Sequence, residues 1–220
     1  MKATIASLIF LLLSLAVSSQ TYKYIGIEEG LSNQKIYRIQ KDARGYMWFL
    51  THVGIDRYNG KEIKHYKLKE GDRELDPLLN INWTYLDKTG TLLVTGKQGR
   101  IFRYDSGHDR FVQIYSMYNY WNKDYHAFVR YSYIDQEDNV WLCGKSAIHL
   151  FNIESGQKQR ISNRLGNITC IEQINSEHFF IGTDKRIYLV KLENGNLKEL
   201  SCGKLEMIDM HVHELYLHRT

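Results

Sequence analysis

Short apolar stretches recur along the chain at similar intervals, and turn-forming residues flank each of them. The first is GYMWFLT, centred on Trp48, and related stretches surround Leu93, Trp141, Phe180 and Tyr216. The intervals between these five positions are 45, 48, 39 and 36 residues. Self-similarity at such a period is typical of a repeat architecture, and about 40 to 45 residues can hold four short strands.

Each repeat is predicted to contain four strands. The first strand begins near an aliphatic residue, the second carries the large apolar anchor, and a glycine-containing hairpin joins the third to the fourth. Glycine fits there because tight hairpins need positive φ values. The anchors are expected to pack between neighbouring sheets. The positions assigned to this scaffold are Gly45, Trp48, Gly54, Gly60, Leu93, Gly107, Trp141, Gly156, Phe180 and Gly195.

The predicted fold is all-β, a β-propeller segment of four four-stranded blades and part of a fifth. The blades are expected at about residues 30–67, 78–115, 127–162 and 165–201, and the partial blade at 204–220. Residues 22–27 resemble a fourth strand without a blade of its own, so we expect an incomplete ring. A closed four-bladed ring and a β-sandwich with fortuitous self-similarity are the alternatives.

The N-terminus has the pattern of a secretory signal peptide. Lys2 is followed by an apolar run from Ala3 to Val17, and the small residues Ser18 and Ser19 come next. The run is shorter than the roughly 20 residues that a membrane-spanning helix needs, which argues against an uncleaved anchor. We therefore expect residues 1–19 to be removed, and residues 20–220 to be exported to the periplasm.

Charge and cysteine content exclude several classes of function. The formal net charge of the 220 residues is only +4, which is too weak to indicate a nucleic-acid partner. The three cysteines, Cys143, Cys170 and Cys202, form no Cys-x-x-Cys pair, so neither a zinc site nor a disulfide framework is predicted. A Cys170–Cys202 bridge remains an alternative. His211 and His213 have no third ligand at a convincing spacing, so no metal or cofactor is expected.

The first repeat, EEGLSNQKIYRIQKDARGYMWFLTHVGIDRYNG, resembles the two-component regulator propeller repeat. The other copies are degenerate, since Leu93 and Phe180 replace Trp and Arg186 stands where Gly54 stood. The positions that carry the resemblance are Gly30, Leu31, Asn33, Asp42, Gly45, Trp48, Thr51, Gly54, Tyr58 and Asn59.

The resemblance implies the periplasmic sensor part of a hybrid two-component system. Such a parent protein combines a signal peptide, two propellers, a small β-sandwich and an inner-membrane helix with cytoplasmic kinase, receiver and DNA-binding domains. Its sensor recognises oligosaccharides, and a homodimer is one assembly open to it. No phosphoacceptor histidine with an ATP-binding domain is found in this chain, so we expect it to be no enzyme.

One segment is predicted to touch the ligand. Residues 116–128, SMYNYWNKDYHAF, join the second and third units and are interpreted as the longest such link. Aromatic rings with flanking amides suit a sugar, because the apolar face of a pyranose stacks while its hydroxyls need hydrogen bonds. A Tyr-rich loop that packs on its own blade is the alternative. The candidate ligand-binding residues are Tyr118, Tyr120, Trp121 and Tyr125, with His52 in the loop after the second strand.

The sequence therefore favours a ligand-sensing propeller that recognises an oligosaccharide without catalysis. An exported polysaccharide lyase or hydrolase is one alternative, and it would need paired carboxylates or a Tyr–His pair facing the channel. A purely structural or partner-docking propeller is another. No Gly-x-Ser-x-Gly motif and no phosphate-binding glycine loop is present in the 220 residues.

Overall fold

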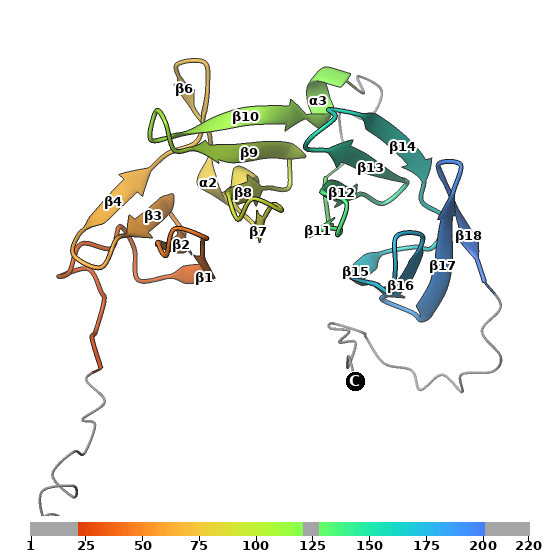
Figure 1. Ribbon diagram of the computed structural model, residues 1–220, viewed down its shortest axis with the longest axis horizontal. Helices are drawn as coiled ribbons and strands as arrows, with labels where there is room; N and C mark the ends of the chain where they lie inside the picture. The colour runs from red at the N-terminus through yellow and green to blue at the C-terminus, as the bar shows by residue number, and fades with distance from the viewer. Residues whose placement is uncertain (1–21, 121–127, 201–220) are drawn as a thin grey trace, which may run out of the picture.

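The computed structural model describes residues 22–120 and 128–200. Four antiparallel four-stranded sheets follow one another along an arc, and each is a simple up-and-down meander (Figure 1). The innermost strands of successive sheets contact one another in chain order, and no closed ring forms among the described residues. The predicted all-β propeller segment with four blades is confirmed. The predicted signal peptide and the partial fifth blade lie outside the described residues.

A hairpin and a short helix separate the first two blades. Blade 1 consists of β1 (Ile36–Lys41), β2 (Met47–Thr51), β3 (Ile55–Tyr58) and β4 (Ile63–Tyr66). A two-stranded hairpin, β5 (Lys69–Glu70) and β6 (Arg73–Glu74), and the short helix α2 (Pro77–Asn80) follow. Blade 2 consists of β7 (Trp83–Leu86), β8 (Leu92–Thr95), β9 (Arg100–Asp105) and β10 (Arg110–Ser116).

The last two blades repeat the same order. A single helical turn, α3 (Met117–Tyr120), ends blade 2. Blade 3 consists of β11 (Tyr131–Ile134), β12 (Asn139–Cys143), β13 (Ala147–Asn152) and β14 (Lys158–Ser162). Blade 4 consists of β15 (Ile168–Gln173), β16 (His178–Thr183), β17 (Ile187–Glu193) and β18 (Asn196–Glu199). Within the described residues, no helix has the length and apolar character needed to cross a bilayer.

One prediction about the links is wrong. The link between blades 1 and 2 spans residues 67–82, while the link between blades 2 and 3 spans residues 117–130. The first link is therefore the longer one. It gains its length from the β5–β6 hairpin and α2, whose start is capped when the Asp76 carboxylate accepts a hydrogen bond from the Leu78 backbone N–H. Lys, Glu, Asp and Arg dominate the hairpin, so it offers no apolar periodicity that would reveal it in the sequence.

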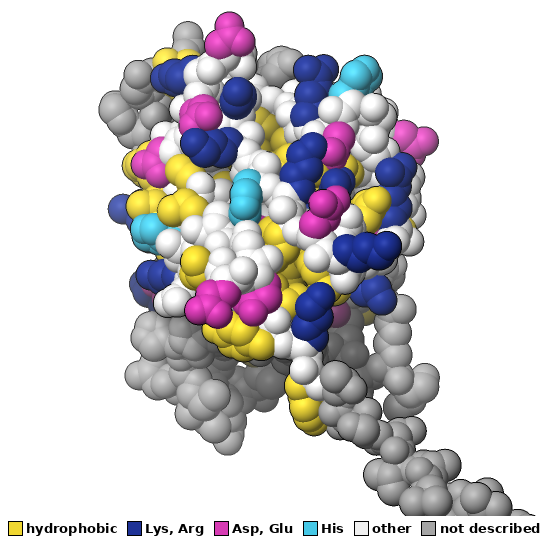
Figure 2. All heavy atoms as spheres, turned by 90° about the vertical axis from the view of Figure 1, so that its left-hand side faces the viewer, with side chains coloured by type: hydrophobic (Ala, Val, Ile, Leu, Met, Phe, Trp, Pro, Cys, Tyr) yellow, Lys and Arg dark blue, Asp and Glu magenta, His cyan; other side chains and the backbone are white. Residues whose placement is uncertain are grey.

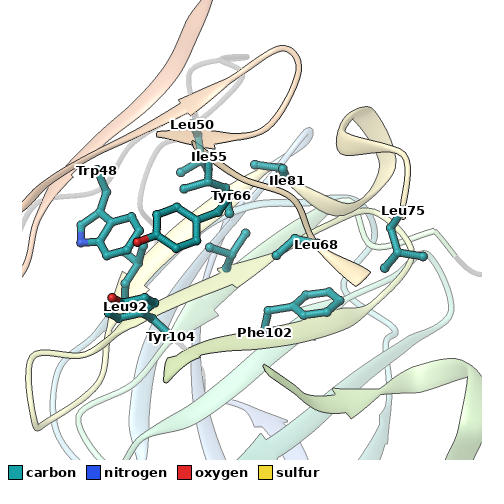
Figure 3. Close-up of a cluster of buried hydrophobic side chains, with 11 residues drawn as sticks. Trp48, Leu50, Ile55, Tyr66, Leu68, Leu75, Ile81, Leu92, Phe102 and Tyr104 are labelled. Atoms are coloured by element: carbon teal, nitrogen blue, oxygen red, sulfur yellow. The ribbon is translucent and has the colours of Figure 1, made fainter. Parts of the chain in front are cut away.

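Buried side chains fill the space between neighbouring blades. Figure 3 shows the cluster between blades 1 and 2, where Trp48 and Leu50 on β2 face Leu92 on β8 and Phe102 on β9. Trp48 is fully buried, and its ring meets the ring of Tyr104 edge-on at a centroid distance of 4.7 Å. Such pairs add about 0.5–1.5 kcal/mol beyond the burial of their surface.

The anchors of the other blades occupy the corresponding positions. Leu93 faces blade 3, and Trp141 faces blade 4, where its ring lies 4.8 Å from that of Phe179. Both are fully buried. Phe180 pairs in register with Glu172 as Trp48 pairs with Gln40, yet it is only half-buried. The described residues place no further blade against that face, which accounts for its exposure.

An acidic turn holds each tryptophan anchor in place. The Asp42 carboxylate accepts hydrogen bonds from the backbone N–H groups of Arg44 and Tyr46, and from Trp48 Nε1 at 2.8 Å. Asp135 does the same for Trp141 Nε1 at 2.9 Å. Blades 1 and 3 thus share a buried pair of carboxylate and indole as well as a turn.

Where the tryptophan is missing, the partner of the carboxylate changes. Blade 2 has Leu93 as its anchor, and there Arg103 Nε donates to Asp87 at 2.8 Å. Blade 4 has Phe180, and Ile174 stands six residues earlier, in the place of the aspartate. Its turn is built instead on Asn175, whose side-chain oxygen accepts from two backbone N–H groups.

The hairpin glycines do not all share one conformation. Gly45, Gly60, Gly156 and Gly195 have positive φ values between 68° and 98°. Gly107 is not in this region, and its hairpin instead places Asp109 at a φ of 49°. Gly54 also lacks a positive φ, but a Cβ there would lie 2.9 Å from the backbone oxygen of Tyr66. Close backbone approach is therefore the reason for glycine at position 54.

Asp109 joins the outer parts of blades 1 and 2. Its carboxylate accepts hydrogen bonds from Arg57 at 2.9 Å, from Lys64, and from the hydroxyls of Tyr66 and Tyr104. The guanidinium of Arg57 also lies 5.4 Å from the ring centroid of Tyr66. Burial of Asp109 opposes its ionisation, but the bonds from Lys64 and the two tyrosines outweigh this and lower the pKa of its carboxyl well below the usual range.

Candidate functional site

Two kinds of connection meet at one end of the arc. In an up-and-down meander, the loop after the second strand and the link into the first strand of the next blade lie at the same end. Backbone hydrogen bonds tie them together: Val129 N–H donates to Lys97 O at 2.9 Å, and Asp184 N–H donates to Asn167 O at 3.1 Å. We call this end the entry face. It comprises residues 31–35, 52–54, 80–82, 96–99, 128–130, 144–146, 163–167 and 184–186.

A groove of about 510 Å³ opens on the entry face where blades 2, 3 and 4 approach one another. Its lining comes from the starts of β7, β11 and β15, from the β8–β9 loop, and from the links into β11 and β15. We call it the entry groove. Its lining residues are Trp83, Lys97, Phe128, Val129, Arg130, Tyr131, Asn167, Ile168 and Thr169.

The lining combines rings, cations and polar donors. Phe128 is 55% exposed, and Trp83 and Tyr131 are half-buried, so aromatic surface is available to a ligand. Lys97 and Arg130 are exposed, and Arg130 Nη1 donates to the side-chain oxygen of Asn167 at 3.3 Å. This mixture can stack an apolar ring face and bind hydroxyl or anionic groups.

Tyr131 keeps its proton across the physiological range. Burial raises the pKa of its phenol to about 12, although a hydrogen bond with the Ile171 backbone acts in the opposite direction. No Asp, Glu or His is among the described residues that line the groove. Hydrolysis of a glycosidic bond normally uses a pair of carboxylates, and none is among these described lining residues.

The structure places the sequence-predicted ligand residues unevenly. Tyr118 is 47% exposed on α3, next to Met117, whose backbone N–H donates to Gly99 O in the β8–β9 loop. Tyr120 ends the same helix. Trp121 and Tyr125 lie outside the described residues, but Phe128, the last residue of the predicted segment, lines the entry groove.

His52 lies on the entry face of blade 1, away from the groove. Its Nδ1 lies 2.7 Å from the hydroxyl of Tyr37, and its backbone N–H donates to Lys35 O. The Lys35 ammonium lies 5.2 Å from the ring centroid of Tyr37. Tyr37 and His52 therefore form a Tyr–His contact on blade 1 that the sequence pattern did not reveal.

Sequence reasoning missed most of the groove. Trp83, Arg130, Tyr131 and Asn167 stand at or just before the starts of inner strands, where they looked like ordinary strand or loop residues. The signal that could have found them is positional. Residues entering the first strand of each blade share the face on which the notable Tyr-rich link was expected.

A second cavity and the cysteines are the other candidate sites. A second cavity of about 410 Å³ lies between blades 3 and 4, and its lining is rich in amides, including Asn139, Asn152 and Gln159. Among the described residues, no group of three His, Cys, Asp or Glu side chains is placed to hold a metal ion. Cys143 and Cys170 are both buried, while Cys202, His211 and His213 lie outside the described residues.

A comparison with protein-family models matches residues 30–52 to the two component regulator propeller family. These residues run from the opening of blade 1 through β2, so they include the turn at Asp42 and the Trp48 anchor. No curated protein shows significant sequence similarity to the chain.

Solved structures share the fold. An extracellular domain assigned to the hybrid two component system BT3049 from B. thetaiotaomicron matches with a TM-score of 0.61 and 18% identity over 81% of this chain. The chain spans 26% of that structure. PorZ, a bacterial surface component of the type-IX secretion system of Porphyromonas gingivalis, matches with a TM-score of 0.53 and 9% identity, over 78% of this chain and 21% of its own. At these identities the likeness shows the propeller fold alone.

Proposed function

Since the chain carries a two component regulator propeller repeat at residues 30–52, we propose that it is part of the ligand-sensing propeller of a hybrid two-component sensor. In this proposal the ligand is an oligosaccharide and the entry groove binds it. The propeller is exported to the periplasm and belongs to a longer parent with a further propeller, a β-sandwich, an inner-membrane anchor and a kinase. The extracellular-domain neighbour, which this chain covers only in part, supports such a parent.

The composition of the entry groove is the observation that carries the proposal. It offers rings from three elements together with lysine, arginine and amide groups, and its described lining contains no acid–base pair. Saccharide recognition needs a ring to stack on and several hydrogen-bond donors. Hydrolysis would need in addition two carboxylates on either side of the scissile bond.

The position of the groove suggests how binding is relayed. A ligand seated there contacts blades 2, 3 and 4 at once, because the lining comes from β7, β11 and β15 and their approaches. It can shift an equilibrium between two arrangements of these blades only to the extent that it binds one more tightly. Signalling then requires that the favoured arrangement be passed to the parent's downstream parts.

The Tyr-rich segment remains part of the proposal as a candidate contact for the ligand. It runs directly into Phe128, so Trp121 and Tyr125 are at most seven residues away from a lining position along the chain. Tyr118 and Tyr120 precede them on α3. In this proposal these four residues also contact the ligand.

Calorimetry with a panel of neutral and acidic oligosaccharides tests the proposal. Phe128→Ala and Trp121→Ala should each weaken binding about three- to tenfold, as expected for the loss of one stacked ring. Tyr24→Ala is the matched control, because Tyr24 is 75% exposed and its neighbour Lys23 contacts Tyr58, at the end of blade 1 opposite the entry face. The proposal is lost if no oligosaccharide binds, or if Phe128→Ala and Trp121→Ala bind like wild type.

A lyase is the second candidate, and the Tyr37–His52 contact at 2.7 Å is the observation that favours it. A lyase abstracts a proton next to a carboxylate and leaves an unsaturated product, and a tyrosine or histidine can act as its base. Incubation with acidic polysaccharides and detection of the unsaturated product by ultraviolet absorbance tests this candidate. Product that disappears in His52→Ala would support a lyase, and no product from wild type would exclude it.

A further inference from the structure

The entry face is strongly basic. Seven Lys or Arg residues and one Asp lie in the ranges given for it, a net formal charge of +6, whereas the whole chain carries +4. The rest of the first link, residues 67–79, adds three basic and four acidic residues, so the excess stays positive when they are included. All seven basic residues are exposed, and the acidic residue, Asp184, is half-buried. The basic residues are Lys35, Lys97, Arg130, Lys145, Arg164, Lys185 and Arg186.

A lysine recurs at one position of the blade. Lys97, Lys145 and Lys185 each stand two residues after the end of the second strand, in blades 2, 3 and 4. Blade 1 has Val53 there instead. Because the blades are arranged side by side around the groove, the repeat distributes one exposed ammonium per blade along three consecutive loops.

These charges are not neutralised by the rest of the described structure. None of the seven takes part in an ion pair among residues 22–120 and 128–200, although other basic residues there do. Arg57 pairs with Asp109, and Arg103 pairs with Asp87. Unpaired like charges that share a surface raise its potential and attract anions.

Other surfaces of the molecule differ. On the side of blade 1 seen in Figure 2, Lys and Arg side chains are interspersed with Asp and Glu, and hydrophobic side chains are exposed between them. At the end opposite the entry face, Asp42, Asp87 and Asp135 use their carboxylates to cap turns. The excess of positive charge is therefore a property of the entry face.

We infer that the ligand of the entry groove is an anionic saccharide that carries carboxylate or sulfate groups. This inference rests on the proposed function and makes its ligand specific. Arg130 offers a planar fork of N–H donors that matches a carboxylate or a sulfate, and Lys97, in the β8–β9 loop, adds a point charge to the same lining. The sugar rings between the anionic groups stack on Phe128 and Trp83.

The neighbouring blades extend the same recognition along the ligand. Lys145, Arg164 and Lys185 lie on the loops and the link of blades 3 and 4, beyond the groove. A chain of several anionic residues can therefore contact cations outside the groove, while a single sugar reaches only Lys97 and Arg130. Affinity should rise with the length of the saccharide and fall with added salt, as for other polyanions on exposed cations.

Calorimetry on the same chain distinguishes this inference from the proposed function. The panel comprises oligogalacturonates, chondroitin sulfate oligosaccharides, and neutral xylo- and galacto-oligosaccharides, each at low and at moderate salt. We expect at least one acidic series to bind about tenfold or more tightly than either neutral series, a gap of about 1.4 kcal/mol. The acidic series that binds more tightly shows whether the groove prefers carboxylates or sulfates.

Charge-removing variants complete the test. Lys97→Gln and Arg130→Gln should each weaken the binding of acidic saccharides about fivefold or more and that of neutral ones clearly less, because only the acidic ligands lose a charge-assisted contact. Lys61→Gln, in the exposed hairpin at the opposite end, is the matched control and should bind like wild type.

Each other outcome overturns one of the two claims. Binding of neutral saccharides with equal or greater affinity refutes the anionic ligand and leaves the sensor proposal standing. No saccharide binding at all refutes the proposed function, and the inference falls with it. Binding only to vesicles that contain phosphatidylglycerol, and not to any saccharide, would identify a membrane surface and refute both.

Discussion

The buried pair of Asp42 and Trp48 offers a direct test of how the blades are held together. Trp48→Phe keeps an aromatic ring in the space between blades 1 and 2 but removes the indole N–H. The Asp42 carboxylate, which is only 7% exposed, then loses the donor at 2.8 Å while it keeps its bonds to backbone N–H groups. The smaller ring also gives up contact with Tyr104 and Phe111.

The expected loss can be estimated from these contacts. A hydrogen bond to a charged group is worth about 1.5–3 kcal/mol, and weaker contact with the aromatic neighbours adds about 1 kcal/mol. Trp48→Phe should therefore lower the free energy of unfolding by about 3 kcal/mol. For a chain of this size that corresponds to a fall in Tm of about 6–12 °C. Trp141→Phe, which removes the donor to Asp135 in blade 3, should give a similar loss.

Far-UV circular dichroism during thermal and urea unfolding measures the effect. Trp83→Phe is the matched control, because Trp83 is half-buried at the groove, and its loss should be below about 1 kcal/mol. If Trp48→Phe and Trp141→Phe both cost less than about 1 kcal/mol, or no more than Trp83→Phe, the pair of carboxylate and indole does not stabilise the blades.

Other substitutions and conditions test separate parts of the structure. Asp109→Asn should cost about 1–2 kcal/mol in urea unfolding, a value reduced because the carboxylate is partly exposed, and Arg57 would lose its ion-pair partner. The pKa of the Asp109 carboxyl is lowered in the folded state, so its contribution to the free energy of unfolding is complete above its unfolded pKa of about 4 and is lost as the pH falls further. The loss of stability below about pH 4 should therefore be smaller in Asp109→Asn than in wild type. Equal slopes of the free energy of unfolding against pH in the two proteins would contradict this. Gly96→Ala should lower the Tm and cost about 1–3 kcal/mol, since its Cβ would lie 2.3 Å from the Cα of Asn80, and an unchanged Tm would refute that close approach. Burial raises the pKa of the Cys143 thiol well above its usual value, so the thiol should not react with iodoacetamide in the native chain. Mass spectrometry should find Cys143 unalkylated in the native chain and alkylated in urea. Rapid alkylation of the native chain would contradict the buried position.

The repeat could be predicted from the sequence because its signals are local. Trp48 and Trp141 stand in apolar runs at a regular interval, and Asn59-Gly60 is a strong hairpin signal. The four meanders that the structure shows follow from this pattern. The turn of blade 3 was harder to place, because Asp138, with a φ of 59°, stands where blade 1 has a glycine.

The partners of the anchors could not be predicted, because they depend on contacts between strands. In blade 2, Arg103 takes the place of a tryptophan as the hydrogen-bond donor to Asp87. This contact forms only when β8 and β9 pair in register. The β5–β6 hairpin was missed because its four strand residues are all charged. Neither feature changes the period of the apolar anchors.

The candidate site and the segment predicted to touch the ligand overlap in one residue. The entry groove opens beside Phe128, the last residue of the Tyr-rich link. Lys97, Arg130 and Asn167 come from three separate connections, so only the three-dimensional arrangement brings them together. The basic character of the entry face was hidden in the overall charge, because carboxylates at the turns of the opposite end offset it.

Hydrogen exchange measured with and without a bound saccharide tests the central claim most directly, that the entry groove is the ligand site. Ligand should slow exchange of the amides in residues 96–98, 128–131 and 167–169, which belong to the groove or its rim, and should leave the hairpin at residues 59–62 unchanged. Protection confined to the opposite end, or to the outer strands alone, would contradict the claim.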